Sequence, residues 1–134
     1  MSDSKLIAQQ FMNKSVVTFS ADDQVMDAIH ELVERQISGA PVVDSQGNLV
    51  GVLTERDCLA TVLTAGYHGE AAGRVLEYMS RDVVTVDADA SLMDIAERFA
   101  STPYRRFPVL KNNRLVGLIS RRDVLRAVLQ HSAG

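Results

Sequence analysis

Two kinds of hydrophobic pattern alternate along the chain. Short apolar runs rich in valine predict β-strands, and apolar residues at positions i, i+1, i+4, i+7 and i+8 predict one face of an amphipathic helix. The same order of elements occurs twice: a β run, a helix, two strands joined by a polar turn, and a closing helix. The pattern therefore predicts two copies of a β-α-β-β-α unit.

The predicted elements have matching positions in the two copies. The strands are 15–19, 40–43 and 49–53 in the first copy, and 82–86, 107–110 and 115–119 in the second. The apolar positions of the first helices are Val25, Met26, Ile29, Leu32 and Val33, and Leu92, Met93, Ala96, Phe99 and Ala100. Those of the closing helices are Leu59, Val62 and Leu63, and Leu125, Val128 and Leu129. Ser20 and Asp87 are the expected N-caps of the first helices, and Gly66 the expected end of the first closing helix.

Single residues also recur at a fixed offset. Met12 opens the first repeat and Met79 the second, 67 residues later, and the two strand prolines, Pro41 and Pro108, share this offset. We expect a lead-in helix over residues 1–11, a first repeat over 12–66, a linker and second lead-in helix over 67–78, a second repeat over 79–130, and a tail over 131–134.

One stretch of the repeat carries polar residues that suggest chemistry. Gly51-Val52-Leu53-Thr54-Glu55-Arg56-Asp57 recurs as Gly117-Leu118-Ile119-Ser120-Arg121-Arg122-Asp123. Thr54-x-x-Asp57 and Ser120-x-x-Asp123 have the form of a capping box, with Asp in the place of Glu. Two interpretations remain open at this point, a pair of helix caps and a pair of ligand-binding carboxylates.

Composition and charge exclude several functional classes. The chain has 134 residues and a formal net charge of −3, which argues against general nucleic-acid binding. No apolar run approaches the roughly 20 residues of a membrane span, and the N-terminus lacks the pattern of a signal peptide. The single cysteine, Cys58, is expected to be a buried small side chain in a cytoplasmic protein. The three histidines lack metal-ligand spacing, and no nucleophile–base pair is visible, so we expect neither a metal site nor an enzyme.

The repeated motif, the apolar-Pro-Val strands and the Met-x-x-x-Val-Val-Thr starts resemble a tandem pair of cystathionine-β-synthase (CBS) domains, also called a Bateman module. The resemblance covers about residues 10–130. It implies an α/β fold of the α+β type, with two β-α-β-β-α repeats packed sheet to sheet about a pseudo-two-fold axis. Such packing also hides the sheet faces that one repeat alone would leave exposed.

The resemblance further implies two clefts that bind an adenine nucleotide (AMP, ADP or ATP) or S-adenosylmethionine as a regulatory ligand, with no other cofactor. The motif aspartate would accept hydrogen bonds from the ribose hydroxyls. The implied residues of the first cleft are Thr54, Asp57, Thr85, Ala90, Tyr104, Arg105 and Arg106. Those of the second are Thr18, Ile37, Ser38, Gly39, Ala40, Ser120, Arg122 and Asp123. Arg105 and Arg106 stand in the segment where the family often places basic residues that meet the phosphates, whereas the matching Ser38 and Gly39 carry no charge.

We therefore expect a regulatory module that senses an adenine nucleotide and signals to an unknown partner protein. A homodimer is expected through the outer flanks of the helices, with residues such as Met26, Ile29, Met93 and Phe99. The alternative is a structural or interaction module whose clefts are degenerate and empty.

Overall fold

The computed structural model of the chain describes residues 6–66 and 72–132. It divides into two compact units, each described here by itself. The first-repeat unit contains residues 17–83, and the second-repeat unit contains the residues up to 16 together with those from 84 onward. The expected lead-in over 1–11 and the tail over 131–134 are thus described only in part, and 67–71 of the linker lies outside the described residues.

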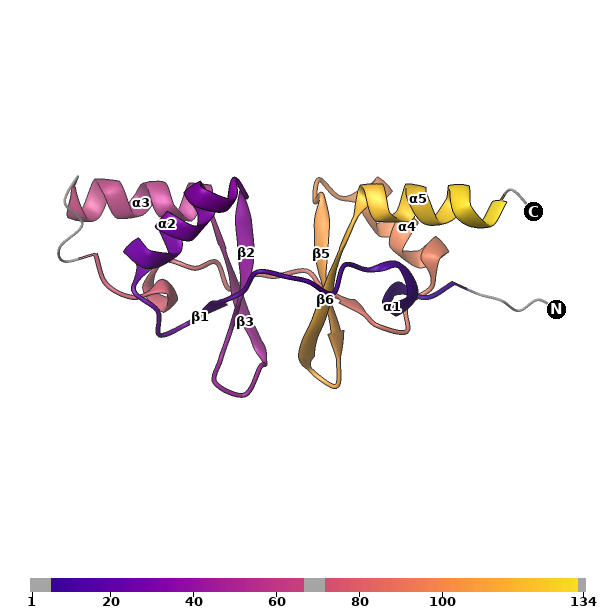
Figure 1. Cartoon of the computed structure of the whole chain (residues 1–134), viewed down its shortest axis with the longest axis horizontal. Coiled ribbons are helices and arrows are strands. Elements are labelled where there is room, and N and C mark those ends of the chain that lie inside the picture. The colour runs from indigo at the N-terminus through magenta and orange to yellow at the C-terminus, as the bar shows by residue number, and fades with distance from the viewer. Residues whose placement is uncertain (1–5, 67–71, 133–134) are drawn as a thin grey trace. The chain divides into compact units, whose positions relative to one another are not determined.

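The first-repeat unit is a three-stranded sheet covered by two helices. Its elements are β1 (Phe19–Ser20), α2 (Val25–Arg35), β2 (Gly39–Val43), β3 (Leu49–Thr54), α3 (Glu55–Ala65) and the 3-10 turn η1 (Val75–Glu77). The strand order is β1-β2-β3, with β1 parallel to β2 and β2 antiparallel to β3. Figure 1 shows α2 and α3 on the same side of this sheet.

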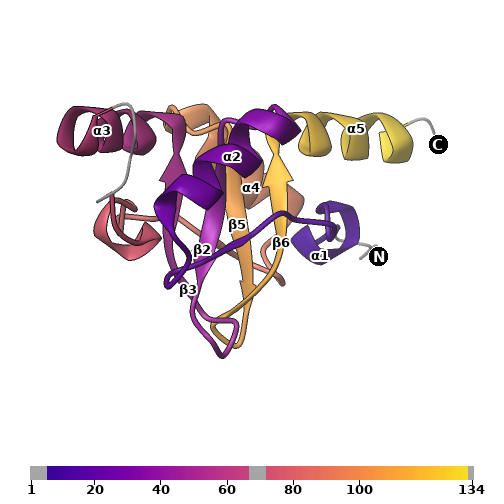
Figure 2. The ribbon, with the colours of Figure 1, turned by 60° about the vertical axis from the view of Figure 1, so that its left-hand side comes forward.

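The second-repeat unit has the same architecture. Its elements are α1 (Ala8–Phe11), β4 (Val86–Asp87), α4 (Leu92–Ser101), β5 (Arg106–Lys111), β6 (Arg114–Ser120) and α5 (Arg121–Ser132). The strand order is β4-β5-β6, with β4 parallel to β5 and β5 antiparallel to β6. The short helix α1 lies beside β6 and α5 (Figures 1 and 2). The mixed α/β class and the repeated order of elements predicted from the sequence are confirmed.

Each unit has its own hydrophobic core between sheet and helices. The first-repeat core includes Phe19, Val25, Ala28, Leu32, Val42 and Leu53. The second-repeat core includes Val86, Ile95, Phe99, Phe107, Val109 and Ile119. In the latter, the rings of Phe99 and Phe107 stack with their centroids 4.4 Å apart. Phe99 is therefore a core residue and does not lie on the outer flank of its helix, where the sequence analysis placed it.

The repeat-opening methionines explain the motif glycines. Asn13 pairs with Leu118 of β6 through reciprocal backbone hydrogen bonds of 2.8 and 2.9 Å. This pairing lays Met12 on Gly117, where a Cβ atom would come within 2.5 Å of the methionine Sδ. In the same way, Ser80 pairs with Val52 of β3, and Met79 lies over Gly51. Only glycine leaves room for this approach, so each motif glycine is the contact point for the methionine that opens the other repeat.

Three local predictions are wrong. The runs 15–19 and 82–86 are assigned as strand only at Phe19–Ser20 and Val86–Asp87, the residues that pair with β2 and β5. Ser20 and Asp87 do not cap the helices, because each closes a turn between strand and helix, and the N-caps are Gln24 and Ser91. The second lead-in helix is only the single 3-10 turn η1. The end of α3 at Gly66 is confirmed.

The most apolar face of each closing helix is not the face that it buries. Cys58 and Thr61 of α3 are buried, as are Val124 and Ala127 of α5. The leucine-rich positions are instead exposed: Leu59 64%, Val62 47% and Leu63 89% in α3, and Leu125 64%, Val128 44% and Leu129 71% in α5. Each closing helix thus presents an unpartnered apolar stripe to solvent. Among the described residues, no helix has the length and apolar content needed to cross a membrane.

Candidate functional site

The Thr54–Asp57 pair forms a complete capping box at the start of α3. The Thr54 hydroxyl oxygen accepts a hydrogen bond from the Asp57 backbone N–H at 3.2 Å. In return, the backbone N–H and the hydroxyl of Thr54 donate to Asp57 Oδ2 at 2.9 and 3.0 Å. The cap interpretation is therefore confirmed for this copy, and it uses one carboxylate oxygen, Oδ2.

The other oxygen of Asp57 faces a different partner. Asp57 Oδ1 accepts a hydrogen bond of 3.0 Å from the hydroxyl of Ser80, which is exposed to solvent. A neutral, exposed hydroxyl exchanges readily with water or with the hydroxyl of a ligand. The cap thus fixes the carboxylate in orientation and leaves Oδ1 as an acceptor that a bound molecule can use.

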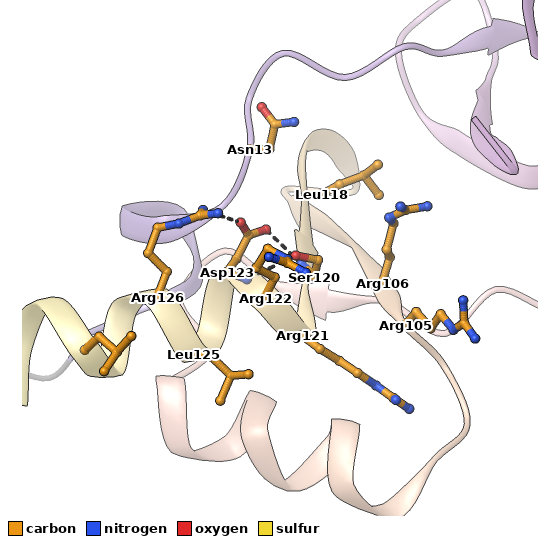
Figure 3. A pocket seen from close by; sticks show the side chains of 11 residues that line it. Asn13, Arg105, Arg106, Leu118, Ser120, Arg121, Arg122, Asp123, Leu125 and Arg126 are labelled. Carbon is orange, nitrogen blue, oxygen red and sulfur yellow. Dashed lines mark hydrogen bonds and ion pairs between the residues drawn. The ribbon is translucent and has the colours of Figure 1, made fainter. Parts of the chain in front are cut away.

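The second copy has the same cap with a charged partner. The Asp123 N–H donates to Ser120 Oγ at 3.1 Å, and the Ser120 N–H donates to Asp123 Oδ2 at 2.9 Å. Asp123 Oδ1 accepts from Arg126 Nη1 at 3.1 Å, an ion pair along α5 (Figure 3). Asn13 occupies the position of Ser80, but its side-chain oxygen accepts from the Ser15 N–H at 3.0 Å. The two motif carboxylates thus make the same cap through Oδ2, but their Oδ1 atoms have different partners.

Each motif lies beside the strand start that precedes the proline of the same unit. Thr54 pairs with Gly39 across β2 and β3, and Ser120 pairs with Arg106 across β5 and β6. The first backbone N–H of each closing helix also bonds to this segment, from Glu55 to the carbonyl of Ser38 and from Arg121 to that of Arg105. Ile37 and Ala40 flank the segment in the first repeat, with Ala40 buried.

An open hollow of about 960 Å³ lies against α5 in the second-repeat unit (Figure 3). Its polar lining includes Arg105, Arg106, Ser120, Arg122, Asp123 and Arg126. Arg121 also lines it, but this side chain is tied down, since Nε donates to the Tyr104 carbonyl at 3.0 Å and Nη2 to the Thr102 carbonyl at 3.3 Å. Arg121 therefore secures the loop before β5.

The remaining candidate residues are distributed over both units. Thr85 and Ala90 line a second hollow of about 870 Å³ beside α4. The Tyr104 ring lies 6.0 Å from that of Phe107 and is partly exposed. Thr18 lies exposed just before β1. The structure thus brings Arg105, Arg106 and Arg122 together with Ser120 and Asp123, while the assignment of each carboxylate to residues of the other repeat stays a prediction.

The cysteine beside Asp57 is not a reactive group. Cys58 is buried, and burial, followed by the nearby charges of Asp57 and Glu55, raises the pKa of its thiol from 9.0 to about 11. A thiol with a raised pKa is a poor nucleophile at neutral pH. The expectation of a buried small side chain is confirmed. Among the described residues, no group of three or more His, Cys, Asp or Glu side chains is arranged to hold a metal ion.

Three residues at these positions were missed by the sequence analysis. Arg126 lies one helical turn after Asp123, and this spacing alone indicates a possible ion pair. Ser80 is 23 residues from Asp57 in the chain. Ser80 and Asn13 each directly follow a repeat-opening methionine, so alignment of the two repeats was the signal that linked them.

Two units of the same fold, each with a capped carboxylate at the start of its closing helix, define a tandem-repeat protein. The chain belongs to the CBS-domain family, whose model matches it twice, over residues 7–64 and 75–130. This confirms the resemblance seen in the sequence.

Individual relatives place the chain among CBS-pair proteins. It is 31% identical to the CBS domain-containing protein YhcV of Bacillus subtilis, over 92% of this chain and 86% of that protein. It is 34% identical over 89% of its length to an inosine-5'-monophosphate dehydrogenase of Methanocaldococcus jannaschii, with which it shares only the CBS region. The chain spans 23% of that enzyme and 41% of an uncharacterized protein from the same organism.

Among solved structures, the chain is similar to CBSX2, a CBS-pair protein from Arabidopsis thaliana. The crystal structure of CBSX2 in complex with AMP has a TM-score of 0.79 and 29% sequence identity to it, and the match covers 94% of this chain and 98% of that one.

Proposed function

We propose that this chain is a regulatory module that binds an adenine nucleotide and signals its occupancy to a partner protein. The observation that carries the proposal is the pair of capped aspartates, each with one oxygen outside the cap. The similarity to CBSX2, which was crystallised with AMP, supports the adenine nucleotide as the ligand. S-adenosylmethionine is a further candidate from the family resemblance. A binding role, without catalysis, fits these residues.

The chemistry of the motif suits a ribose. A cis-diol offers two O–H donors, and an ionised carboxylate is an acceptor with several lone pairs. Asp57 is pre-oriented by the Thr54 cap, so binding a ribose costs little side-chain entropy. The ligand need only displace the exposed Ser80 hydroxyl from Oδ1. We therefore assign Asp57 and Asp123 as the ribose acceptors. The cleft residues implied by the resemblance, including Thr85, Ala90 and Tyr104 for Asp57, belong to the same proposal, except that we assign Arg105 and Arg106 to Asp123, because they line the hollow that contains it.

Replacing Asp57 by Asn tests the ribose contact, because an amide retains an oxygen for the cap and loses the charge. Hydrogen bonds to charged groups contribute about 1.5–3 kcal/mol, so the affinity for adenosine and AMP at this site should fall by about tenfold or more. Isothermal titration calorimetry of the folded variant measures the loss. Asp27→Asn, a neutralised first-turn acid of α2 in the same unit, is the matched control and should bind like the wild type.

The outcomes separate the two interpretations of the motif. Unchanged affinity in Asp57→Asn would assign Asp57 to the cap alone. If AMP, ADP, ATP, adenosine and S-adenosylmethionine all leave the melting temperature of the wild type unchanged, the interaction-module alternative gains, because a ligand of the native state must raise that temperature.

The same proposal includes a homodimer. The apolar stripes of α3 and α5 remain exposed in the single chain, and Met93 of α4 is 70% exposed. Contiguous exposed apolar surface marks an interaction site. A second copy offers the same stripes, which a two-fold axis brings together.

A further inference from the structure

The residues that line the hollow beside α5 are far more basic than those at the matching positions of the first repeat. Five arginines and one aspartate line it, giving a formal charge of +4. The strand register and helix-start hydrogen bonds identify the counterparts in the first repeat: Arg105 corresponds to Ser38, Arg106 to Gly39, and Arg121 to Glu55. Arg126 corresponds to Ala60. Arg122 alone keeps a basic counterpart, Arg56, so four of the five lining arginines are specific to the second repeat and are not a requirement of the shared fold.

Most of these cations are available to a ligand. The side chains of Arg105, Arg106 and Arg122 are exposed and have no hydrogen-bond or ion-pair partner within residues 6–66 and 72–132. Figure 3 shows Arg105 and Arg106 rising from the strand side of the hollow and Arg126 reaching back along α5 to Asp123. Guanidinium groups bind phosphate oxygens in bidentate geometry and remain charged at all working pH values.

Arg126 changes what Asp123 can bind. It occupies Asp123 Oδ1, the oxygen outside the cap, through a 3.1 Å contact. An uncharged nucleoside that places its diol on Oδ1 competes with Arg126 for this oxygen and offers Arg126 no anion in return. A ligand with phosphates supplies Arg126 with another anion. The ion pair is partly buried, since the Arg126 side chain is 56% exposed and the Asp123 side chain only 14%, so losing it without a replacement anion costs more than losing a fully exposed pair.

From these observations we infer that the hollow beside α5 is a site for a nucleoside carrying two or more phosphates, and that Arg126 selects against uncharged nucleosides at this site. A monophosphate carries at most about two negative charges and leaves about half of the charge of the lining unbalanced. The inference rests on the proposed function for the nucleoside and adds to it the phosphate number and the means of selection.

Titrations followed by amide NMR test the site directly. The Ser120 and Asp123 signals report on the hollow, and the Thr54 and Asp57 signals report on the first repeat. The probes are adenosine, AMP, ADP, ATP and inorganic triphosphate, with the wild type, Arg126→Gln, and Lys111→Ala as a control that removes a cation outside the hollow. In the wild type, ATP should bind about tenfold or more tightly than adenosine at Ser120 and Asp123. In Arg126→Gln, adenosine should bind more tightly and ATP less tightly, while Lys111→Ala should match the wild type.

Each other outcome has a distinct meaning. Equal changes for adenosine and ATP in Arg126→Gln, or no change for either, would overturn the role of Arg126. Nucleotides that shift only the Thr54 and Asp57 signals would leave the proposed function standing and overturn the site beside α5. Binding of inorganic triphosphate alone would make the hollow a polyanion site and overturn both the nucleoside assignment and the proposed function. Without a shift by any probe in either unit, both fail.

Discussion

Single residues of the motif serve the fold and the proposed site at the same time. Oδ2 of Asp57 and of Asp123 completes a helix cap, while Oδ1 faces Ser80 in one copy and Arg126 in the other. Substitution by alanine removes both oxygens and mixes a loss of stability with a loss of binding. Asparagine is therefore the better replacement, because it keeps an oxygen for the cap and removes the charge that the ligand would use.

Cys58 gives a prediction at the same scale, since its raised pKa couples to stability. The folded state favours the neutral thiol, so the contribution of Cys58 is complete below its ordinary pKa of 9.0 and is lost as the pH rises through about 11. Urea unfolding of the wild type should therefore lose more stability between pH 8 and 11 than unfolding of Cys58→Val, which carries the residue type found at Val124. Parallel pH profiles for the two proteins would contradict this coupling.

At the scale of elements, sequence patterns located the four long helices and the hairpin strands well but failed on which face the closing helices bury. Leu59, Val62 and Leu63 form the most apolar stripe of α3, yet Cys58 and Thr61 face the core. Periodicity identifies an apolar face but not what covers it, because a core and a subunit interface have the same chemistry. The caps at Thr54 and Ser120 were predictable from spacing alone, whereas the Ser80 contact required a packed lead-in segment that spacing does not reveal.

Substitution of Gly117 tests how tightly Met12 and Asn13 pack on β6. A Cβ at position 117 would lie 2.5 Å from Met12 Sδ and 2.9 Å from the Asn13 carbonyl oxygen. Overpacking of this kind costs about 1–3 kcal/mol, so Gly117→Ala should lower the urea midpoint and speed hydrogen exchange at the Leu118 amide, which bonds to Asn13. Adding Met12→Ala should restore part of the stability by removing the thioether. An unchanged midpoint in Gly117→Ala would show that the segment does not pack tightly on β6.

At the scale of the whole molecule, the exposed stripes give a prediction about assembly. Full burial of one leucine contributes about 1.5–3 kcal/mol, so a charge at Leu63 and at Leu129 should be costly in a dimer and nearly neutral in a monomer. Light scattering should give about twice the chain mass of 14.7 kDa for the wild type and about one chain mass for the Leu63→Glu/Leu129→Glu protein. Gln130→Glu, which adds the same charge at an exposed position of α5, should remain dimeric. A wild-type mass of one chain at high micromolar concentration would refute the dimer.

The docking of Met12 on Gly117 and of Met79 on Gly51 has a topological consequence. Each folded unit consists of one repeat followed by a lead-in segment, and the second repeat takes the segment that stands first in the chain. A circular permutant of this chain, with its ends joined and a new N-terminus at Val84, would therefore make each unit continuous in sequence. In the present chain order, the second-repeat unit folds only when residues more than 100 positions apart, such as Asn13 and Leu118, come into contact. Because loops of this length close slowly, this unit should fold more slowly than the first-repeat unit.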